Sequence, residues 1–344
     1  MNVTRASIFV LVLVSALLNG DRQGWAQPAE GGASAWKVSG KAIVDPSGRP
    51  IHPRGFNVCW WVPVTDQDAA DIQRVGANCV RYMFGYEPRG TYDPAQVSEV
   101  EAQVRSFTKR GIWVIPVLYE CERKDAASGR TVQPWDDPQL NREFLALWTD
   151  LVRRLGSDPL VVAWEPLNEP HGGATPATIA AWYRGVITQF RRYDPSRPIV
   201  VEGANYSHPE DLVDAIKMAD PNIIYAFHFY YPYEYTTDLR NPPLDYPGEW
   251  GKSYLEQKMA PALRFREKFN VPVWCGEWGT KTGAAHYERW MNDVFGILHA
   301  NGLDWCMWAW ARPASDPRNA SFDINPDKAD VYRLMPAFFG QAGN

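Results

Sequence analysis

Features that would assign the chain to several common functional classes are scarce among its 344 residues. No CxxC pair and no His/Cys spacing suggests a metal site. The formal net charge is −5, and no basic patch stands out to neutralise phosphates, which argues against a nucleic-acid partner. No shift in composition and no long linker marks a second folded domain. These absences leave a single acidic catalytic or binding domain as the expectation.

Cysteine is also scarce, and four of the five cysteines lie inside apolar runs. This placement favours small buried hydrophobic side chains over a disulfide framework. A bridge between Cys275 and Cys306, on neighbouring strands, stays open for an exported protein. The five positions are Cys59, Cys79, Cys121, Cys275 and Cys306.

The apolar run near the N-terminus is too short to span a membrane. It extends from Ala6 to Leu18 behind Arg5, whereas a spanning helix needs roughly 20 residues. Gly24-Trp25-Ala26 then offers a small-x-small cleavage site, which is typical of a secretory signal peptide. We predict a signal peptide over 1–26, a flexible Gly/Ala-rich leader over 27–35 and a secreted or periplasmic domain over 36–344 without stable membrane association. A buried helix or an uncleaved anchor is the alternative.

After the leader, short apolar runs and amphipathic segments alternate eight times, which predicts an α/β fold of the (β/α)8 TIM-barrel type. A β-hairpin near residues 36–44 precedes the barrel and should cover one of its ends. The Tyr- and Pro-rich stretch 231–251 should form a large loop at the barrel mouth. The apolar runs are Gly55–Trp60, Ala77–Tyr82, Ile112–Leu118, Leu160–Trp164, Ile199–Glu202, Ile223–His228, Val271–Gly276 and Leu303–Trp308. Helices are expected at Val97–Lys109, Leu140–Leu155, Pro176–Arg192, Tyr254–Lys268 and Tyr287–Ala300.

Two carboxylates follow barrel strands directly. Glu169 comes after the fourth run with Asn168 beside it, and Glu277 comes directly after the seventh. Because active sites of this barrel lie at the C-terminal ends of the strands, both carboxylates should meet at one rim. Glycosidic bond cleavage uses one carboxyl group to protonate the departing oxygen and another to capture or stabilise the positive charge. The 16 tryptophans add indole faces on which sugar rings stack.

Other chemically apt residues fall on the same rim. Arg81 ends the second run, His228 ends the sixth and Trp308 ends the eighth. Tyr230 follows His228 by two residues, so both side chains should point to the same face of the strand. Packing alone does not explain such a convergence.

In this order, the motifs Asn168-Glu169-Pro170, His228-Phe229-Tyr230 and Gly276-Glu277-Trp278-Gly279 resemble those of glycoside hydrolase family 5, the cellulase-like family of retaining barrels. The resemblance runs from the hairpin near Trp36 to the end of the eighth strand. It implies that Glu169 is the general acid/base, with a pKa raised by partial burial next to a carboxylate, and that Glu277 is the nucleophile. No metal or cofactor is expected, because the two carboxylates supply the acid/base and nucleophilic functions.

The resemblance also implies roles for the supporting residues. Arg81 would hold Glu277 by two hydrogen bonds and keep it ionised, and Tyr230 would donate to the same carboxylate. Asn168 would bond the sugar 2-hydroxyl, and Trp308 would form the stacking floor of the site. His228 would join Tyr230 in the substrate-binding and supporting set.

The sequence departs from the family pattern at strand three, which commonly ends in histidine but here ends Leu118-Tyr119-Glu120. Tyr119 or Glu120 would then contact the sugar, which leaves the substrate open. Glu165 is expected to be buried near its strand end or purely structural. Glu202, at the end of the fifth run, is expected to be supporting.

We interpret the chain as a secreted, monomeric, retaining β-glycosidase whose partner is a β-linked polysaccharide or oligosaccharide. An endo-β-1,4-glucanase is favoured. An endo-β-1,4-mannanase or an exo-acting β-glucosidase stays open within the family. A catalytically silent carbohydrate-binding barrel is the alternative from another class, and the presence of both Glu169 and Glu277 argues against it.

Overall fold

The structure is a computed structural model that describes residues 36–61, 64–85, 92–237, 244–311, 322, 324, 326–327 and 329–340. The predicted signal peptide, its cleavage site and the leader lie outside these residues. Across the described part of the chain, no helix is both long and apolar enough to cross a membrane.

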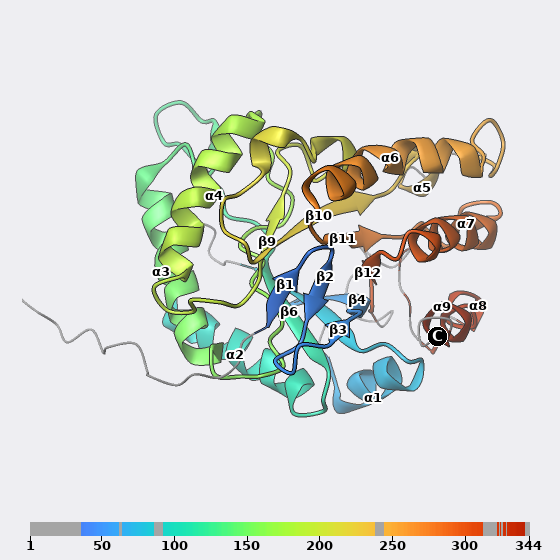
Figure 1. Ribbon diagram of the computed structural model, residues 1–344, viewed down its shortest axis with the longest axis horizontal. Helices are drawn as coiled ribbons and strands as arrows, with labels where there is room; N and C mark the ends of the chain where they lie inside the picture. The colour runs from blue at the N-terminus through green and yellow to red at the C-terminus, as the bar shows by residue number, and fades with distance from the viewer. Residues whose placement is uncertain are drawn as a thin grey trace, which may run out of the picture. The chain divides into compact units, whose positions relative to one another are not determined.

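Seven parallel strands curl around the core (Figure 1). The predicted fourth strand is irregular: Val161 pairs with Val114 and Trp164 with Ile199 through isolated bridges. These bridges connect the two edge strands and close the ring, so the predicted (β/α)8 barrel is confirmed. In sheet order the strands are β6 (Trp113–Leu118), β5 (Cys79–Phe84), β4 (Arg54–Cys59), β12 (Asp304–Met307), β11 (Val273–Trp278), β10 (Ile223–Phe229) and β9 (Ile199–Glu202).

Helices surround the strands on the outside of the ring (Figure 1). Three of them begin alike, because Asp93, Asp137 or Thr175 caps the first turn and a proline follows at once. The helices are α1 (Asp66–Arg74), α2 (Pro94–Thr108), α3 (Pro138–Leu155), α4 (Pro176–Phe190), α5 (Tyr233–Thr236), α6 (Lys252–Phe269), α7 (Tyr287–Ala300), α8 (Ala329–Tyr332) and α9 (Met335–Gly340). Two 3₁₀ turns, Pro209–Asp211 and Asp214–Ile216, follow β9 in place of a helix.

The predicted N-terminal hairpin gains a third strand and covers the N-terminal end of the barrel. It consists of antiparallel β1 (Lys37–Ser39), β2 (Ala42–Val44) and β3 (Pro50–Ile51). The Trp36 Nε1–H donates to the carbonyl of Pro159 at 2.8 Å, just before the fourth strand segment. The Val38 N–H donates to the Asn222 Oδ1 at 3.1 Å, just before β10. The candidate site lies at the opposite end. A small antiparallel pair, β7 (Arg123–Lys124) and β8 (Thr131–Val132), follows β6.

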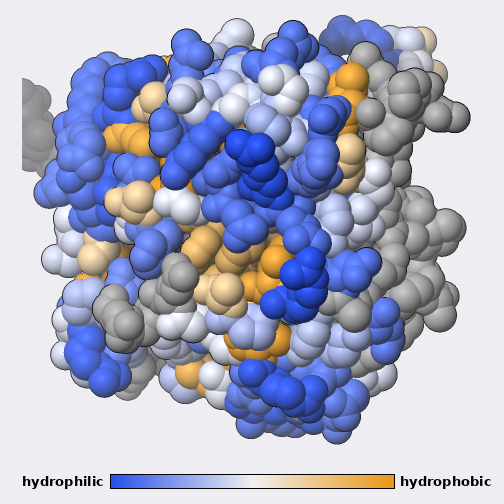
Figure 2. Space-filling view, turned by 90° about the vertical axis from the view of Figure 1, so that its right-hand side faces the viewer, coloured by the Kyte–Doolittle hydropathy of each residue, from blue (hydrophilic) through white to orange (hydrophobic). Residues whose placement is uncertain are grey.

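All five cysteines are buried and none is in a disulfide, so Cys275 and Cys306 form no bridge. Within the predicted loop 231–251, residues 238–243 lie outside the described set. The side of the molecule in Figure 2 is mostly hydrophilic, with hydrophobic residues confined to small areas among polar ones.

Candidate active site

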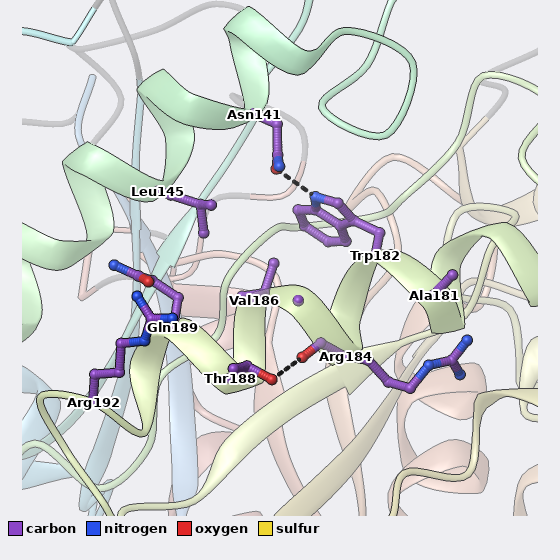
Figure 3. A pocket seen from close by; sticks show the side chains of 10 residues that line it. Asn141, Leu145, Ala181, Trp182, Arg184, Val186, Thr188, Gln189 and Arg192 are labelled. Atoms are coloured by element: carbon purple, nitrogen blue, oxygen red, sulfur yellow. Dashed lines mark hydrogen bonds between the residues drawn. The ribbon is translucent and has the colours of Figure 1, made fainter. Parts of the chain in front are cut away.

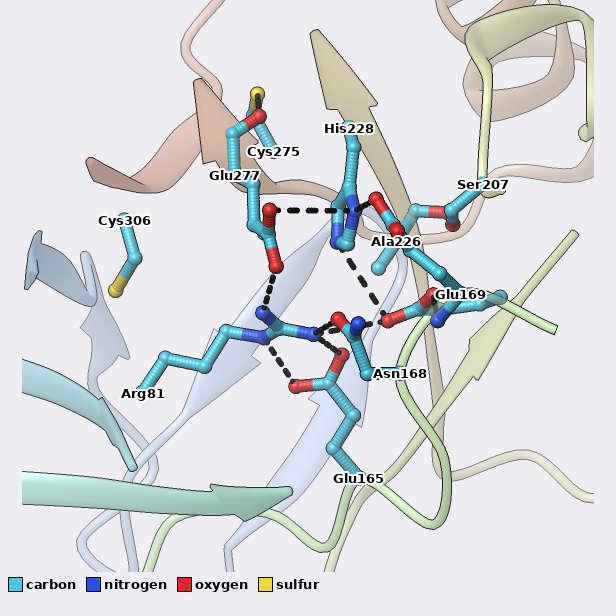
Figure 4. Close-up of polar contacts among 12 residues, drawn as sticks. Arg81, Glu165, Asn168, Glu169, Ser207, Ala226, His228, Cys275, Glu277 and Cys306 are labelled. Carbon is cyan, nitrogen blue, oxygen red and sulfur yellow. Dashed lines mark hydrogen bonds and ion pairs between the residues drawn. The ribbon is translucent and has the colours of Figure 1, made fainter. Parts of the chain in front are cut away.

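The barrel brings predicted site residues together from separate parts of the chain. The side chains of Arg81, Asn168, Glu169, His228 and Glu277 converge (Figure 4). Arg81 lies in the middle of β5, not at its end as predicted, because β5 continues to Phe84. It is fully buried and extends towards the carboxylates of its neighbours.

A β-bulge aligns His228 with Glu277. Phe227 of β10 pairs with Cys275 of β11, but the next residue, His228, pairs with Glu277, so Gly276 is skipped. A Cβ atom at Gly276 would lie 3.0 Å from the His228 Nε2, which is closer than side chains normally approach. A glycine at this position therefore lets the imidazole pack against β11.

Arg81 forms the centre of a buried charge network. Its Nε and Nη2 donate to the two oxygens of Glu165, each at 2.8 Å. Its Nη1 donates to the Glu277 Oε1 at 2.7 Å, and its Nη2 also donates to Asn168 at 2.8 Å and to Glu202 at 3.1 Å. The expected two-pronged grip on Glu277 is therefore wrong: the fork holds Glu165, and Glu277 receives one bond. The reason is that Glu165 faces the guanidinium edge from the fourth strand segment.

Glu169 has an unusual backbone and a titratable side chain. Its φ is 48°, in the left-handed region that residues with a Cβ rarely adopt. Its Oε1 lies 2.7 Å from the His228 Nδ1. Burial raises the pKa of Glu169 to about 7, as expected, and the charge of Arg81 opposes the rise. Burial also lowers the pKa of His228 to about 4, so this imidazole is neutral near pH 7.

Glu277 is almost fully buried and receives two hydrogen bonds. Arg81 donates to one oxygen, and the Tyr230 hydroxyl donates to the other at 2.8 Å. Burial raises the pKa of Glu277 and Glu169 adds to the rise, whereas Arg81 and the Tyr230 hydrogen bond oppose it. The carboxylate is thus oriented on both oxygens by donors that favour its ionised form.

The two carboxyl groups lie close to one another. One oxygen of Glu169, one oxygen of Glu277 and a ring nitrogen of His228 are all within 4.8 Å of each other. Retaining glycosidases separate their carboxyl groups by about 5–5.5 Å and inverting ones by about 6.5–9.5 Å. Glu165, Glu202 and His228 form a second such group, and these two are the described groups whose spacing admits a cation. Arg81 already supplies positive charge at both.

Asn168 is oriented by the same guanidinium. Its Oδ1 accepts from the Arg81 Nη2, and its backbone N–H donates to the carbonyl of Leu118 at 2.9 Å. With the oxygen fixed, the amide nitrogen is the end that remains to donate.

Aromatic residues line the site. Trp308 is 9% exposed and packs in one cluster with Tyr230 and residues of β4, β5 and β6. Tyr119, at the end of β6, packs against Trp60 and Trp61 with ring centroids 5.3 Å apart in both cases. Burial raises the pKa of the Tyr119 hydroxyl, and the nearby Glu277 charge adds to the rise. Tyr119 therefore lies near enough to Glu277 to be affected by its charge, at the position where the sequence departs from the family pattern.

Two features of the site were hard to predict from the sequence: the exposed ring of Tyr206 and the contact between Glu202 and Glu169. Tyr206, in the loop after β9, is 47% exposed and stacks on His171 with centroids 4.8 Å apart and planes 9° apart. Tyr206 and Ser207 both have φ of 58°, and the Ser207 carbonyl accepts the His228 N–H at 2.7 Å. Glu202 could be found as a carboxylate that ends an apolar run, but its contact with Glu169 depends on the loop conformation.

A separate shallow pocket of about 460 Å³ lies on the outside of the barrel between α3 and α4 (Figure 3). Asn141, Trp182 and Gln189 are among its lining residues, and it includes none of the site residues above.

Residues 44–313 match the family model described as Cellulase (glycosyl hydrolase family 5). Endoglucanase C of Acetivibrio thermocellus is 22% identical over 293 residues, which covers 72% of this chain and 84% of that protein. A beta-xylosidase of Phanerodontia chrysosporium is 23% identical over 274 residues, which covers 72% of this chain and 56% of that protein.

Two solved structures share the fold. A hyperthermophilic endo-beta-1,4-glucanase in complex with substrate superposes with a TM-score of 0.67 at 19% identity, covering 83% of this chain and 96% of that one. Thermotoga maritima Cel5A in complex with a mannotriose substrate gives a TM-score of 0.65 at 19% identity, covering 84% of this chain and 97% of that one.

Proposed function

The chain belongs to glycosyl hydrolase family 5, and from this premise we propose that it is an endo-β-1,4-glucanase that retains the anomeric configuration. Glu169 is the general acid/base and Glu277 is the nucleophile. The observation that carries the proposal is the pairing of these two carboxyl groups. One oxygen of each lies within 4.8 Å of the other, burial raises the pKa of Glu169 to about 7, and two donors hold Glu277.

In the first step the protonated Glu169 gives its proton to the glycosidic oxygen as the bond to the anomeric carbon breaks. The Glu277 carboxylate attacks that carbon from the opposite face and forms a covalent glycosyl-enzyme. In the second step Glu169, now ionised, takes a proton from water, whose oxygen attacks the anomeric carbon and releases Glu277. The raised pKa of Glu169 suits both roles, because the group can exist in either form near neutrality.

Neighbouring residues hold the sugar at the point of cleavage. The Asn168 amide nitrogen donates to the 2-hydroxyl, an interaction that strengthens in the transition state. Trp308 forms the floor beneath that sugar, and Tyr119 contacts it from β6. Tyr206 lies beyond the acid/base and offers its exposed ring to the departing sugar.

The choice of β-1,4-glucan follows the family and the endoglucanase among the relatives. β-Mannan is the second candidate, because Thermotoga maritima Cel5A has been solved with cellobiose and with mannotriose. Export by the N-terminal signal, with cleavage near Ala26, and a monomeric state complete the proposal.

The test is a panel of glycans: carboxymethylcellulose, mixed-linkage β-glucan, mannan and xylan. The full chain should shorten the two glucans to oligosaccharides of mixed length, whereas a Glu277→Gln variant should not. Proton NMR during the first minutes should show the β-anomer at the new reducing end. Cleavage of mannan alone would overturn the substrate, and an initial α-anomer would overturn the retaining mechanism.

A further inference from the structure

Glu202 is a fully buried carboxyl group directly behind the acid/base. It ends β9, and its Oε2 accepts the backbone N–H of Glu169 at 2.6 Å. Its Oε1 accepts from Arg81 at 3.1 Å and lies 3.6 Å from the His228 Nε2. Its own N–H donates to the Tyr183 hydroxyl of α4 at 3.2 Å. The charged and titratable groups that face it are Arg81 on β5, Glu165 and Glu169 on the fourth strand segment, Tyr183 on α4 and His228 on β10.

The bond from Glu169 to Glu202 fixes an unfavourable backbone. A residue with a side chain at φ of 48° costs free energy, and surrounding contacts must impose that conformation. The N–H of Glu169 points into the protein interior, where an unpaired donor would be costly. Glu202 supplies its acceptor. The side chain that carries the acid proton is thereby aimed at the His228 Nδ1 and at the space in front of Glu277.

The charges around Arg81 indicate which form of Glu202 is present. Three buried carboxyl groups, Glu165, Glu202 and Glu277, contact this single cation. Glu165 accepts two hydrogen bonds from Arg81, and Glu277 accepts the shortest one. The hydrogen bond from Arg81 to Glu202 is the longest. Burial and the adjacent Glu165 raise the pKa of Glu202 well above its usual range, and Glu165 and Glu202 are hydrogen-bonded to each other. The longer contact with Arg81 and the raised pKa both favour the protonated form of Glu202.

We propose that Glu202 is a positioning residue for catalysis, which in its neutral form accepts the Glu169 N–H and holds the acid/base against His228. This rests on the proposed role of Glu169 as acid/base. A neutral Glu202 fixes Glu169 without adding a negative charge beside it. The pKa of Glu169 is then raised mainly by burial, and the positive charge of Arg81 opposes the rise.

The test compares kcat/KM on two substrates that differ in their need for acid catalysis. 2,4-Dinitrophenyl β-cellobioside has a leaving group that departs without a proton, whereas a cellooligosaccharide requires one. The ratio kcat/KM reports bond cleavage up to the glycosyl-enzyme, so it isolates the acid step from the later hydrolysis. Glu202→Ala removes the acceptor, and Glu202→Gln keeps an acceptor and imitates the neutral acid.

Glu202→Ala should lower kcat/KM on the oligosaccharide by about 100-fold, the effect of misplacing a catalytic group by roughly 1 Å. On the dinitrophenyl substrate the loss should stay below about threefold, because no proton is needed there. Glu202→Gln should resemble the unmodified enzyme on both substrates and leave the basic limb of the pH profile unmoved. Should Glu202→Ala not fold, Glu202→Asp, which draws the acceptor back by one methylene, should show the same unequal loss.

Equal losses on the two substrates would overturn the inference, because they would mean general structural damage. A Glu202→Gln variant as impaired as Glu202→Ala would overturn the neutral form. Glu169→Ala serves as the reference in the same assay and should show the same inequality more strongly. A uniform loss in that reference would instead overturn the acid/base assignment, so the two failures are distinguishable.

Discussion

The hydrogen bond from Tyr230 to Glu277 should set the acidic limit of activity. In Tyr230→Phe the ring stays and only the hydroxyl, which donates to the Glu277 Oε2 at 2.8 Å, is lost. A donor to a carboxylate favours the ionised form, so its removal raises the pKa of Glu277 further. The nucleophile must be ionised, so activity falls as the pH drops through this pKa. The acidic limb of kcat/KM should therefore move to higher pH.

The size of the movement follows from the bond. A hydrogen bond to a charged group contributes about 1.5–3 kcal/mol, and a pKa shift of one unit corresponds to about 1.4 kcal/mol. The acidic limb should therefore move upward by at most roughly 1–2 pH units. The basic limb, where Glu169 loses its proton, lies near pH 7 and should stay in place. The two limbs approach each other, so the profile narrows and its maximum falls. Because the two carboxyl groups interact, the apparent pKa values of both limbs are fitted together to the whole pH profile.

The assay is kcat/KM on an aryl β-cellobioside from pH 3 to pH 9. Tyr246→Phe is the matched control, because the buried Tyr246 hydroxyl also donates to a carboxylate, Asp293, at 2.8 Å but has no contact with the site. The control should leave both limbs unmoved. An acidic limb that stays in place in Tyr230→Phe, or that moves equally in the control, would refute the reasoning.

Three further changes probe the neighbours of the carboxylates. Arg81→Ala leaves three buried carboxyl groups without their cation and should lower the free energy of unfolding in urea by about 3–5 kcal/mol. Arg81→Lys should lie between this variant and the unmodified protein, and an unchanged urea midpoint in Arg81→Ala would contradict the prediction. Trp308→Ala should lower kcat/KM on glucan by about 30-fold, or roughly 2 kcal/mol, with unchanged circular dichroism, and unaltered kinetics would remove it from the sugar site. Tyr206→Ala should raise KM for cellooligosaccharides by about fivefold and spare an aryl cellobioside; equal effects on both would place the ring elsewhere.

The barrel was predictable because each strand is a continuous apolar run between amphipathic segments. Leu160–Trp164 was found as a run, but its irregular pairing depends on bridges to Val114 and Ile199 that no local pattern encodes. Helix α1 was missed because Asp66–Arg74 is mostly polar and buries few apolar side chains. The stretch after β9 forms 3₁₀ turns, and the spacing of its apolar residues likewise does not distinguish such turns from a helix.

The positions of the site residues were predictable for a different reason: the barrel topology brings strand ends to one rim. Their contacts were not. Whether the fork of Arg81 holds Glu165 or Glu277 depends on side-chain angles within a crowded core. The left-handed backbone conformation of Glu169 was not predictable either, because such a conformation is normally signalled by glycine and this position holds glutamate. The hydrogen bond from the Glu169 N–H to Glu202 depends on that conformation.

Azide rescue tests the roles of the two carboxylates most directly. In Glu277→Ala the nucleophile is missing, so azide should attack from the face that Glu277 occupied and yield an α-glycosyl azide. In Glu169→Ala the glycosyl-enzyme still forms with a good leaving group, and azide should release it as the β-glycosyl azide. The anomer of each product is read by NMR. An α-azide from Glu277→Ala and a β-azide from Glu169→Ala are the results that the account predicts, and the opposite pair would reverse the two roles.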